Sequence, residues 1–266
     1  MNDRTLLSSA TLARPIMPRF QVHPVTDIDF PSLTASLWES FETPPQGLLR
    51  LFMPILNNDR ERSLKTCVDA QLAEYHQQQP QCTWIKVVDT HDNDRIAAAA
   101  KWYFYDKSPY NEDGTEHELV ADWYPEGIAR EFATLAVRLF ERPREEMARR
   151  AHAFLHIAFT HPVYRGQGLG RMFMEWGVRI ADERGLEAWL DASDMGAPLY
   201  EKFGFRRILA NKVRPVPERE LSGDEKREWE DCERIMLPIE YTVMWRPVGG
   251  EYVEGETLPW EVKGEK

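Results

Sequence analysis

The stretch that decides the fold runs from His156 to Arg171 and reads HIAFTHPVYRGQGLGR. It begins as an apolar strand and continues into a turn with glycine at every second position, at Gly166, Gly168 and Gly170. Because glycine has no side chain, the backbone N–H groups of this turn can approach a ligand closely. Apolar residues then recur at helical spacing, so the turn forms the positive end of an amphipathic helix. The stretch is therefore suited to an anion, and a phosphate is the natural occupant.

Two common phosphate-binding patterns do not fit this loop. The Walker pattern needs a lysine followed by serine or threonine after the last glycine, whereas an arginine and a methionine follow Gly170. The dinucleotide pattern G-x-G-x-x-G needs a glycine where Phe173 stands. The pattern that remains is Arg165-x-x-Gly168-x-Gly170 between a strand and a helix.

A second motif follows downstream, where residues 196–205 read GAPLYEKFGF. Together with the loop, it resembles the GNAT acetyltransferase superfamily, whose pyrophosphate loop has the pattern Arg/Gln-x-x-Gly-x-Gly/Ala and whose later segment reads LYEKxGF. Both motifs occur in the family's order, which makes the pair more specific than either alone. The resemblance covers residues 153–205 and, less closely, the flanking strands. It does not cover residues 107–150 or 215–235.

The resemblance implies an α/β fold with a mixed sheet of about seven strands, whose central parallel pair is splayed and flanked by helices. It implies acetyl-CoA as the cofactor, with the pantetheine arm between the splayed strands and bound by the backbone of Phe159 and Thr160. The pyrophosphate is expected on the loop and the start of the helix. The residues implied there are Arg165, Gly166, Gln167, Gly168, Leu169, Gly170 and Arg171.

Acetyl transfer leaves a thiolate that needs a proton. A tyrosine, with an ordinary pKa of about 10, can supply one. In the resemblance, Tyr200 matches the tyrosine that hydrogen-bonds the coenzyme sulfur and acts as the general acid. A packing role for Tyr200 on a short helix is the alternative. We expect direct attack of the amine on the thioester, because none of the cysteines lies in a motif that indicates an acyl-enzyme.

The acceptor amine must in turn lose a proton. An alkylammonium of pKa about 10 is neutral in about one molecule per thousand at pH 7, so forming the nucleophile costs roughly 4 kcal/mol. His156, with an ordinary pKa of about 6.5, can accept that proton directly or through water. Some arylalkylamine acetyltransferases resemble the chain here, with a histidine at the position of His156. Other members use a glutamate two residues earlier, where this chain has Phe154. A half-buried structural histidine is the alternative.

Strict alternation along the central strand predicts which side chains share a face with this histidine. One face is expected to carry Phe154, His156, Ala158 and Thr160, and the other Leu155, Ile157 and Phe159. The second-choice bases or acceptor-binding groups are Asp191, Ser193, Glu39 and Glu42.

No metal site is expected from the three histidines in this region. His152 and His156 would lie about 13 Å apart on one strand, too far for a shared ion. His161 has the opposite strand parity and precedes a proline.

The remaining pattern predicts the other elements. Strands are expected at 20–26, 82–88, 96–105, 153–160, 187–192, 205–213 and 238–245, the last of which closes the sheet. Helices are expected at 30–41, 48–56, 60–79, 169–184, 195–203 and through 132–139. The right-handed crossover rule makes the strands on either side of the central helix a parallel pair. The aromatic run 102–105 is either an acceptor wall or ordinary strand packing.

We expect one acetyltransferase domain over residues 19–246, with insertions at about 107–150 and 215–235. The first insertion is either a lid over the acceptor site or a surface helix, and the second is an exposed, charged excursion. Residues 1–18 are expected to be a disordered tail, with a mitochondrial transit peptide as the alternative. Residues 247–266 are expected to be an acidic, loosely ordered tail.

The composition limits partners and compartment. A net charge of -11 disfavours nucleic acid and anionic membranes, and suits a cationic acceptor. No apolar run is long enough to span a membrane. Three widely spaced cysteines favour a reducing compartment, and we expect the cytoplasm. The favoured acceptor is a small-molecule amine. A protein lysine or N-terminus, and a non-catalytic acetyl-CoA-binding module, are the alternatives.

Overall fold

The computed structural model describes residues 18–110 and 119–257 of the chain. Seven strands form one mixed sheet in the order β1-β2-β3-β4-β5-β7-β6, and β4 and β5 are its parallel pair. The strands are β1 Phe20–Pro24, β2 Cys82–Asp89, β3 Arg95–Tyr105, β4 His152–Thr160, β5 Glu187–Ala192, β6 Arg206–Lys212 and β7 Glu240–Arg246. The helices are α1 Phe30–Glu42, α2 Gly47–Phe52, α3 Arg60–Gln77, α4 Ile128–Met147, α5 Leu169–Glu183, α6 Ala197–Glu201 and α7 Gly223–Met236. The predicted mixed α/β sheet is confirmed.

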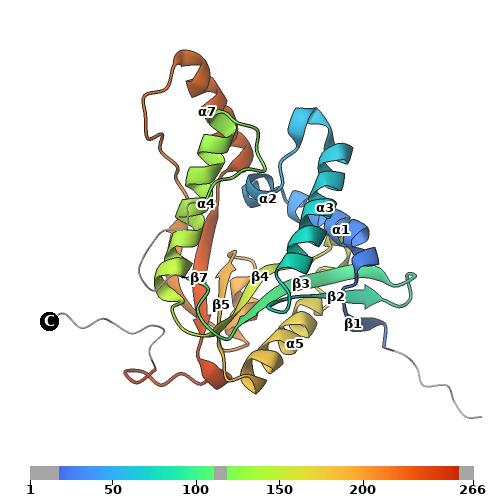
Figure 1. Ribbon diagram of the computed structural model, residues 1–266. Coiled ribbons are helices and arrows are strands. Elements are labelled where there is room, and N and C mark those ends of the chain that lie inside the picture. The colour runs from blue at the N-terminus through green and yellow to red at the C-terminus, as the bar shows by residue number, and fades with distance from the viewer. Residues whose placement is uncertain (1–17, 111–118, 258–266) are drawn as a thin grey trace, which may run out of the picture.

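The two faces of the sheet are covered unequally (Figure 1). Helix α5 lies on one face, and α1, α3, α4 and α7 lie on the other. The apolar side of α5 packs with the small and branched residues of the central strands. The opposite core is larger and more aromatic, because it joins α1, α4 and α7 to the sheet. None of the helices in the described ranges is long and apolar enough to cross a membrane.

The last strand was predicted to close the sheet, and this prediction is wrong. Strand β7 lies between β5 and β6, and pairs antiparallel with both. The burial of the two strands explains this order, since β7 is buried along nearly its whole length whereas β6 is mostly exposed. Charged residues suit an edge position, and β6 carries Arg206, Arg207 and Lys212.

The charged segment 215–235 is mostly exposed, but it contains a helix that was not predicted. It contains α7, which begins with a capping box: Ser222 accepts from the Glu225 N–H, and the Glu225 side chain accepts from the Ser222 N–H. Trp229 of α7 is buried against Phe132 of α4, with ring centroids 4.9 Å apart. The high charge of the segment obscured its apolar side. The predicted tail at 1–18, except its last residue, lies outside the described residues, as do positions 111–118 and 258–266.

Gly177 is a point of close contact between α5 and the sheet. A Cβ atom added there would overlap the indole ring of Trp102, which is fully buried on β3. We therefore expect Gly177→Ala to lower the free energy of unfolding by about 1–3 kcal/mol, because a packed core does not absorb an added methyl group. Urea denaturation measures this loss. The control is Gly223→Ala, since a Cβ at Gly223 meets no atom within 4 Å. Equal stability of the two variants would contradict the prediction.

Candidate active site

The central strands separate partway along their length. Strand β4 pairs with β5 only from His152 to Leu155, opposite Glu187 to Leu190. From there to Thr160, β4 pairs only with β3 on its other side. The edge of β4 that faces β5 is therefore open beyond Leu155 in the described sheet. Such an edge offers unpaired backbone groups to an extended ligand.

A β-bulge at His156 coincides with this opening. On β3, Trp102 is paired with Leu155 and Lys101 with Ile157, which leaves His156 as an extra residue. Strict alternation was therefore the wrong prediction for the faces of β4. The α1/α4 side carries Phe154, His156, Ile157 and Phe159, and the α5 side carries Leu155 and Ala158.

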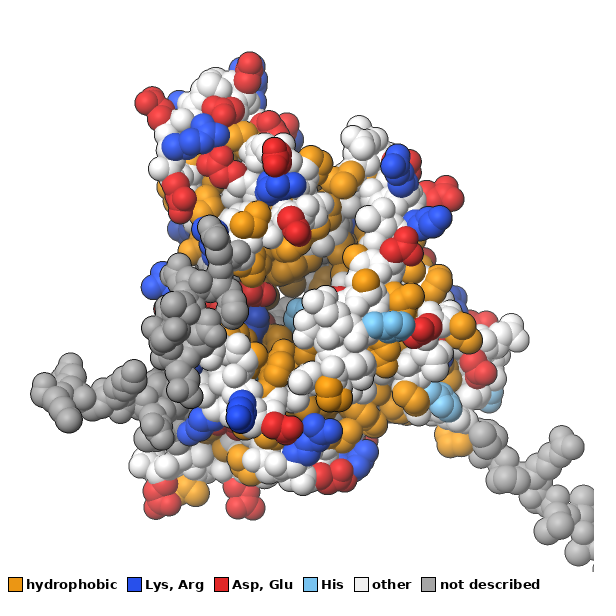
Figure 2. Space-filling view, in the orientation of Figure 1, with side chains coloured by type: hydrophobic (Ala, Val, Ile, Leu, Met, Phe, Trp, Pro, Cys, Tyr) orange, Lys and Arg blue, Asp and Glu red, His pale blue; other side chains and the backbone are white. Residues whose placement is uncertain are grey.

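The ring of His156 lies in an aromatic setting. Its centroid is 5.6 Å from those of Tyr103 and Phe154. The side chain is exposed to solvent, and neither ring nitrogen has a hydrogen-bond partner among the described residues. Loss of hydration among the surrounding side chains, followed by the charge of Lys101, lowers the pKa of His156 to about 3. His156 is thus neutral at physiological pH. Figure 2 shows this face hollowed between the α4/α7 side and the α1/α3 side.

A charged group on α3 borders His156 and was not predicted from the sequence. Glu74 Oε1 accepts hydrogen bonds from Lys101 Nζ at 2.6 Å and from the Tyr103 hydroxyl at 2.7 Å. Burial alone would raise the pKa of Glu74, but Lys101 and the other neighbours outweigh it and lower the pKa. The carboxylate is therefore ionised. Lys101, on an otherwise apolar strand, was the one available signal for this pair.

A second charged group lies beside the opening of the strands. Arg144 of α4 donates to Asp191 of β5 at 2.6 Å and to the Tyr110 hydroxyl at 2.8 Å, and Glu141 lies 3.5 Å away. The guanidinium also lies over the ring of Phe154, 4.1 Å from its centroid. Burial raises the pKa of Asp191, and Arg144 opposes that rise. The carboxylate of Asp191, a second-choice base, is thus engaged with Arg144.

The other second-choice groups are also engaged. Glu39 lies 2.7 Å from His161 Nε2, while Glu42 pairs with Arg50 and Arg60. Ser193 Oγ accepts from the N–H of residue 196 at 3.2 Å, before α6. No group of three metal-ligating side chains converges within residues 18–110 and 119–257.

In His152, the first residue of β4, only one of the two ring nitrogens has a hydrogen-bond partner in the described structure. Its Nδ1 lies 2.8 Å from the Arg150 carbonyl, and its buried Nε2 has no partner in the described part of the chain. Burial lowers the pKa of His152 to about 4. The side chain is therefore neutral and packs between Tyr105 and Tyr110.

The glycine loop joins the open strands to α5. Gly166 and Gly168 have φ angles of 77° and 80°, which a residue with a side chain adopts only with strain. The five successive N–H groups from Gly166 to Gly170 have no protein acceptor in the described structure. They lie at the N-terminus of a 15-residue helix, where the helix dipole favours an anion.

The two arginines of the loop have different surroundings. The Arg165 side chain donates to the carbonyls of Thr160 at 3.2 Å and Ser40 at 2.7 Å, and also to that of Thr43. It therefore connects the loop to the C-terminal end of α1, where a cation is favoured. Arg171 is exposed on α5 and pairs with Glu175 at 2.6 Å. The Arg165 guanidinium thus links the loop to α1, whereas Arg171 lies at the surface.

Tyr200 lies on α6, directly after β5. A Cβ at Gly170 would come within 2.7 Å of Leu199 Cδ2, so α6 packs tightly on the start of α5. The Tyr200 ring lies edge-on to Phe205, with centroids 6.2 Å apart. Its hydroxyl has no hydrogen-bond partner among the described residues, and burial raises its pKa to about 12. The hydroxyl is therefore protonated and available to a ligand.

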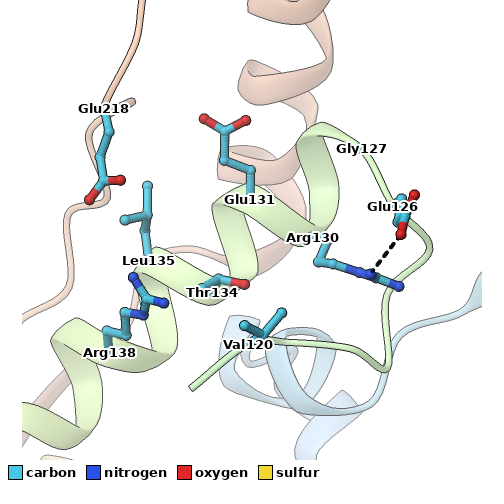
Figure 3. A pocket seen from close by; sticks show the side chains of 9 residues that line it. All are labelled: Val120, Glu126, Gly127, Arg130, Glu131, Thr134, Leu135, Arg138 and Glu218. Carbon is cyan, nitrogen blue, oxygen red and sulfur yellow. Dashed lines mark ion pairs between the residues drawn. The ribbon is translucent and has the colours of Figure 1, made fainter. Parts of the chain in front are cut away.

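A depression on the outer side of α4 is separate from this opening (Figure 3). It has a volume of about 280 Å³ and is bordered by Arg130, Glu131 and Arg138 of α4. Several of its charged groups already have partners: Arg130 lies 3.7 Å from Glu126, and Arg138 donates to the Leu119 carbonyl.

The comparisons agree with this arrangement. Residues 128–207 match the model of the acetyltransferase (GNAT) domain family. The match runs from the start of α4 to the start of β6, and the seven-stranded sheet has the fold of GNAT acetyltransferases. No curated protein matches the sequence.

Several solved structures share the fold at low sequence identity. Arylalkylamine N-acetyltransferase 2 from Aedes aegypti is 12% identical, with a TM-score of 0.57 over 87% of this chain and 100% of that one. The C-terminal condensation domain of Ebony in complex with beta-alanyl-dopamine is 16% identical, with a TM-score of 0.52 over 86% and 99%. A Corynebacterium glutamicum structure described as histone acetyltransferase HPA2 and related acetyltransferase is 17% identical, with a TM-score of 0.50 over 87% and 97%.

Proposed function

We propose that the protein is an N-acetyltransferase that moves the acetyl group of acetyl-CoA to a primary amine of a small molecule. The observation that carries the proposal is the open edge of β4, which runs from the bulge at His156 to the unpaired N–H groups of Gly166–Gly170. A long ligand with an anionic end and an amide-containing arm fits both features. Acetyl-CoA has this chemistry, and its thioester supplies the acetyl group.

In this proposal Tyr200 donates a hydrogen bond, and then a proton, to the sulfur of coenzyme A. A thiol has an ordinary pKa of about 8.5, so full proton transfer from a hydroxyl of pKa about 12 would be uphill by roughly 5 kcal/mol. Tyr200 therefore acts first as a hydrogen-bond donor to the sulfur as negative charge develops there. Proton transfer completes the step as the thiolate leaves. The unpartnered hydroxyl of Tyr200 supports this role.

In the same proposal His156 accepts a proton from the acceptor amine. The lowered pKa of His156 lies far below that of an alkylammonium, so direct proton transfer from the ammonium to the ring is strongly unfavourable. The amine must therefore attack in its neutral form. His156 then accepts a proton from the nitrogen as the new C–N bond makes its N–H bonds acidic. The neutral ring, with both nitrogens unpartnered, supports this order of events.

The surroundings of His156 favour a small acceptor with apolar or aromatic character. Tyr103, Tyr105 and Phe154 border the cleft beside it. One solved structure with this fold is named as an arylalkylamine N-acetyltransferase. A protein acceptor and a non-catalytic acetyl-CoA-binding module predict different results in the following experiment.

The test measures thermal stabilisation by acetyl-CoA and its turnover against a mixed panel of amines and peptides. We expect stabilisation, and turnover with small primary amines. Turnover with peptides alone would indicate a protein acceptor. Stabilisation without turnover would indicate a binding module, and no stabilisation at millimolar acetyl-CoA would overturn the cofactor assignment.

His156→Ala is expected to lower kcat/KM for the amine by about tenfold to a hundredfold, because a proton acceptor is lost. Stabilisation by acetyl-CoA should not change. Because the pKa of His156 is lowered to about 3, its titration should leave no acidic limb in the wild-type rate between pH 5 and 8. The control is His23→Ala on exposed β1. A wild-type limb near pH 6.5 that His156→Ala abolishes would contradict the lowered pKa.

A further inference from the structure

Glu74 carries a carboxylate that is fixed on one side and accessible on the other. Its Oε1 accepts from both Lys101 and Tyr103, and its Oε2 accepts from Gln71 Nε2 at 3.2 Å. A carboxylate has about four acceptor positions, so one remains, on Oε2. The Glu74 side chain is 34% exposed, so the carboxylate is not enclosed in the core.

The same carboxylate is connected to His156 through Tyr103. The Tyr103 hydroxyl bonds Glu74, while the Tyr103 ring lies 5.6 Å from the ring of His156. The charge of Glu74 also acts on His156, because it opposes the lowering of the histidine's pKa. An acceptor nitrogen held at Glu74 would therefore lie beside the proposed proton acceptor.

Holding Glu74 in this way costs the fold stability. Lys101 is 0% exposed, and burial of an ammonium is costly even when it is paired. Gln71 donates its amide N–H to Glu74, which leaves its buried Oε1 without a donor in the described structure. An unpaired buried amide oxygen also disfavours folding. Apolar residues at these positions would pack at lower cost, so a role in function explains why the charges are there.

We infer that Glu74 binds the amino group of the acceptor through a hydrogen bond from the acceptor nitrogen to Oε2, with Gln71, Lys101 and Tyr103 as positioning residues. The inference rests on the proposed function and deepens it, since it selects a cationic primary amine over an alcohol of the same shape. An ammonium offers three donors and a positive charge to the carboxylate, whereas a hydroxyl offers one donor and no charge. Glu74 takes part in binding only: the bound ammonium loses its first proton to solvent water, and the neutral amine then attacks while still hydrogen-bonded to Oε2.

The experiment compares an amine with its matched alcohol. The amine is the one turned over best in the panel, and the alcohol of the same carbon skeleton is measured as a competitive inhibitor. For Glu74→Gln we expect the KM of the amine to rise about tenfold, because a hydrogen bond to a charged group is lost. The inhibition constant of the alcohol should change less than about twofold, and the KM of acetyl-CoA should not change. The matched control is Glu61→Gln, an exposed residue of the same helix.

The double variant Lys101→Met/Glu74→Gln separates binding from folding. It removes the buried ammonium that Glu74→Gln alone leaves without its counter-charge. We expect it to fold and to show the same loss of preference for amine over alcohol. A wild-type preference in either variant would overturn the role of Glu74 while leaving the proposed function intact. Absence of amine turnover by the wild-type protein would overturn both.

Discussion

Replacing Tyr200 with phenylalanine is expected to lower kcat by about a hundredfold or more, because the leaving sulfur loses its hydrogen-bond donor and proton source. The KM of acetyl-CoA should change little, since the loop N–H groups that we propose for the pyrophosphate are untouched. The hydroxyl has no protein partner in the described structure, so its removal should not reduce stability. Steady-state kinetics and a thermal melt measure both effects.

The control for this prediction is Tyr252→Phe. The ring of Tyr252 lies under Arg206 of the edge strand β6, 3.8 Å from its guanidinium carbon. This variant should retain wild-type kcat. A Tyr200→Phe enzyme with unchanged kcat across the pH range would show that the hydroxyl takes no part in the reaction.

Replacing Arg144 with methionine is expected to lower the free energy of unfolding by about 3–5 kcal/mol. Arg144 is 5% exposed, and the side chain of its partner Asp191 is 8% exposed. Without the guanidinium, the buried carboxylate of Asp191 and the half-buried carboxylate of Glu141 would lose their counter-charge. Urea denaturation measures the loss. Arg142→Met, an exposed change on the same helix, should cost less than about 0.5 kcal/mol.

The loss in Arg144→Met should depend on pH in a definite direction. Burial already raises the pKa of both Asp191 and Glu141, and Arg144 opposes that rise. In the variant these pKa values rise further above their unfolded values. A carboxyl whose folded pKa is raised favours folding below the unfolded pKa, and this contribution is lost as pH rises through the folded pKa. The deficit relative to wild type should therefore be larger at pH 8 than at pH 5. An equal deficit at both would contradict this account.

The parts of the site that could be predicted from the sequence are those encoded locally. The glycine loop, the strand before it and the Tyr200 segment each depend on neighbouring residues, and so does the helical period of α5. The mixed sheet with its central parallel pair follows from the order of these elements and the crossover rule. The position of β7 does not follow, because it depends on which strand buries both of its faces.

The charged groups around the cleft could not be predicted in the same way. Lys101 and Glu74 are 27 residues apart, and Arg144 and Asp191 are 47 apart, so only the folded chain brings each pair together. Each residue alone is an ordinary charged residue on a helix or strand. The bulge was missed for a related reason, since alternation along a strand assumes one residue for each residue of the partner strand.

The bulge at His156 is not needed for the regular pairing of β4 with β3. If His156 were deleted, Leu155 would be followed directly by Ile157, and the strand would alternate regularly between its two faces. The register with β3 would become continuous as well. The pairing of β4 with β3 therefore does not depend on this residue. His156 is therefore an extra residue in an otherwise regular strand, and its ring contacts Tyr103 and Phe154 at the point where β4 separates from β5.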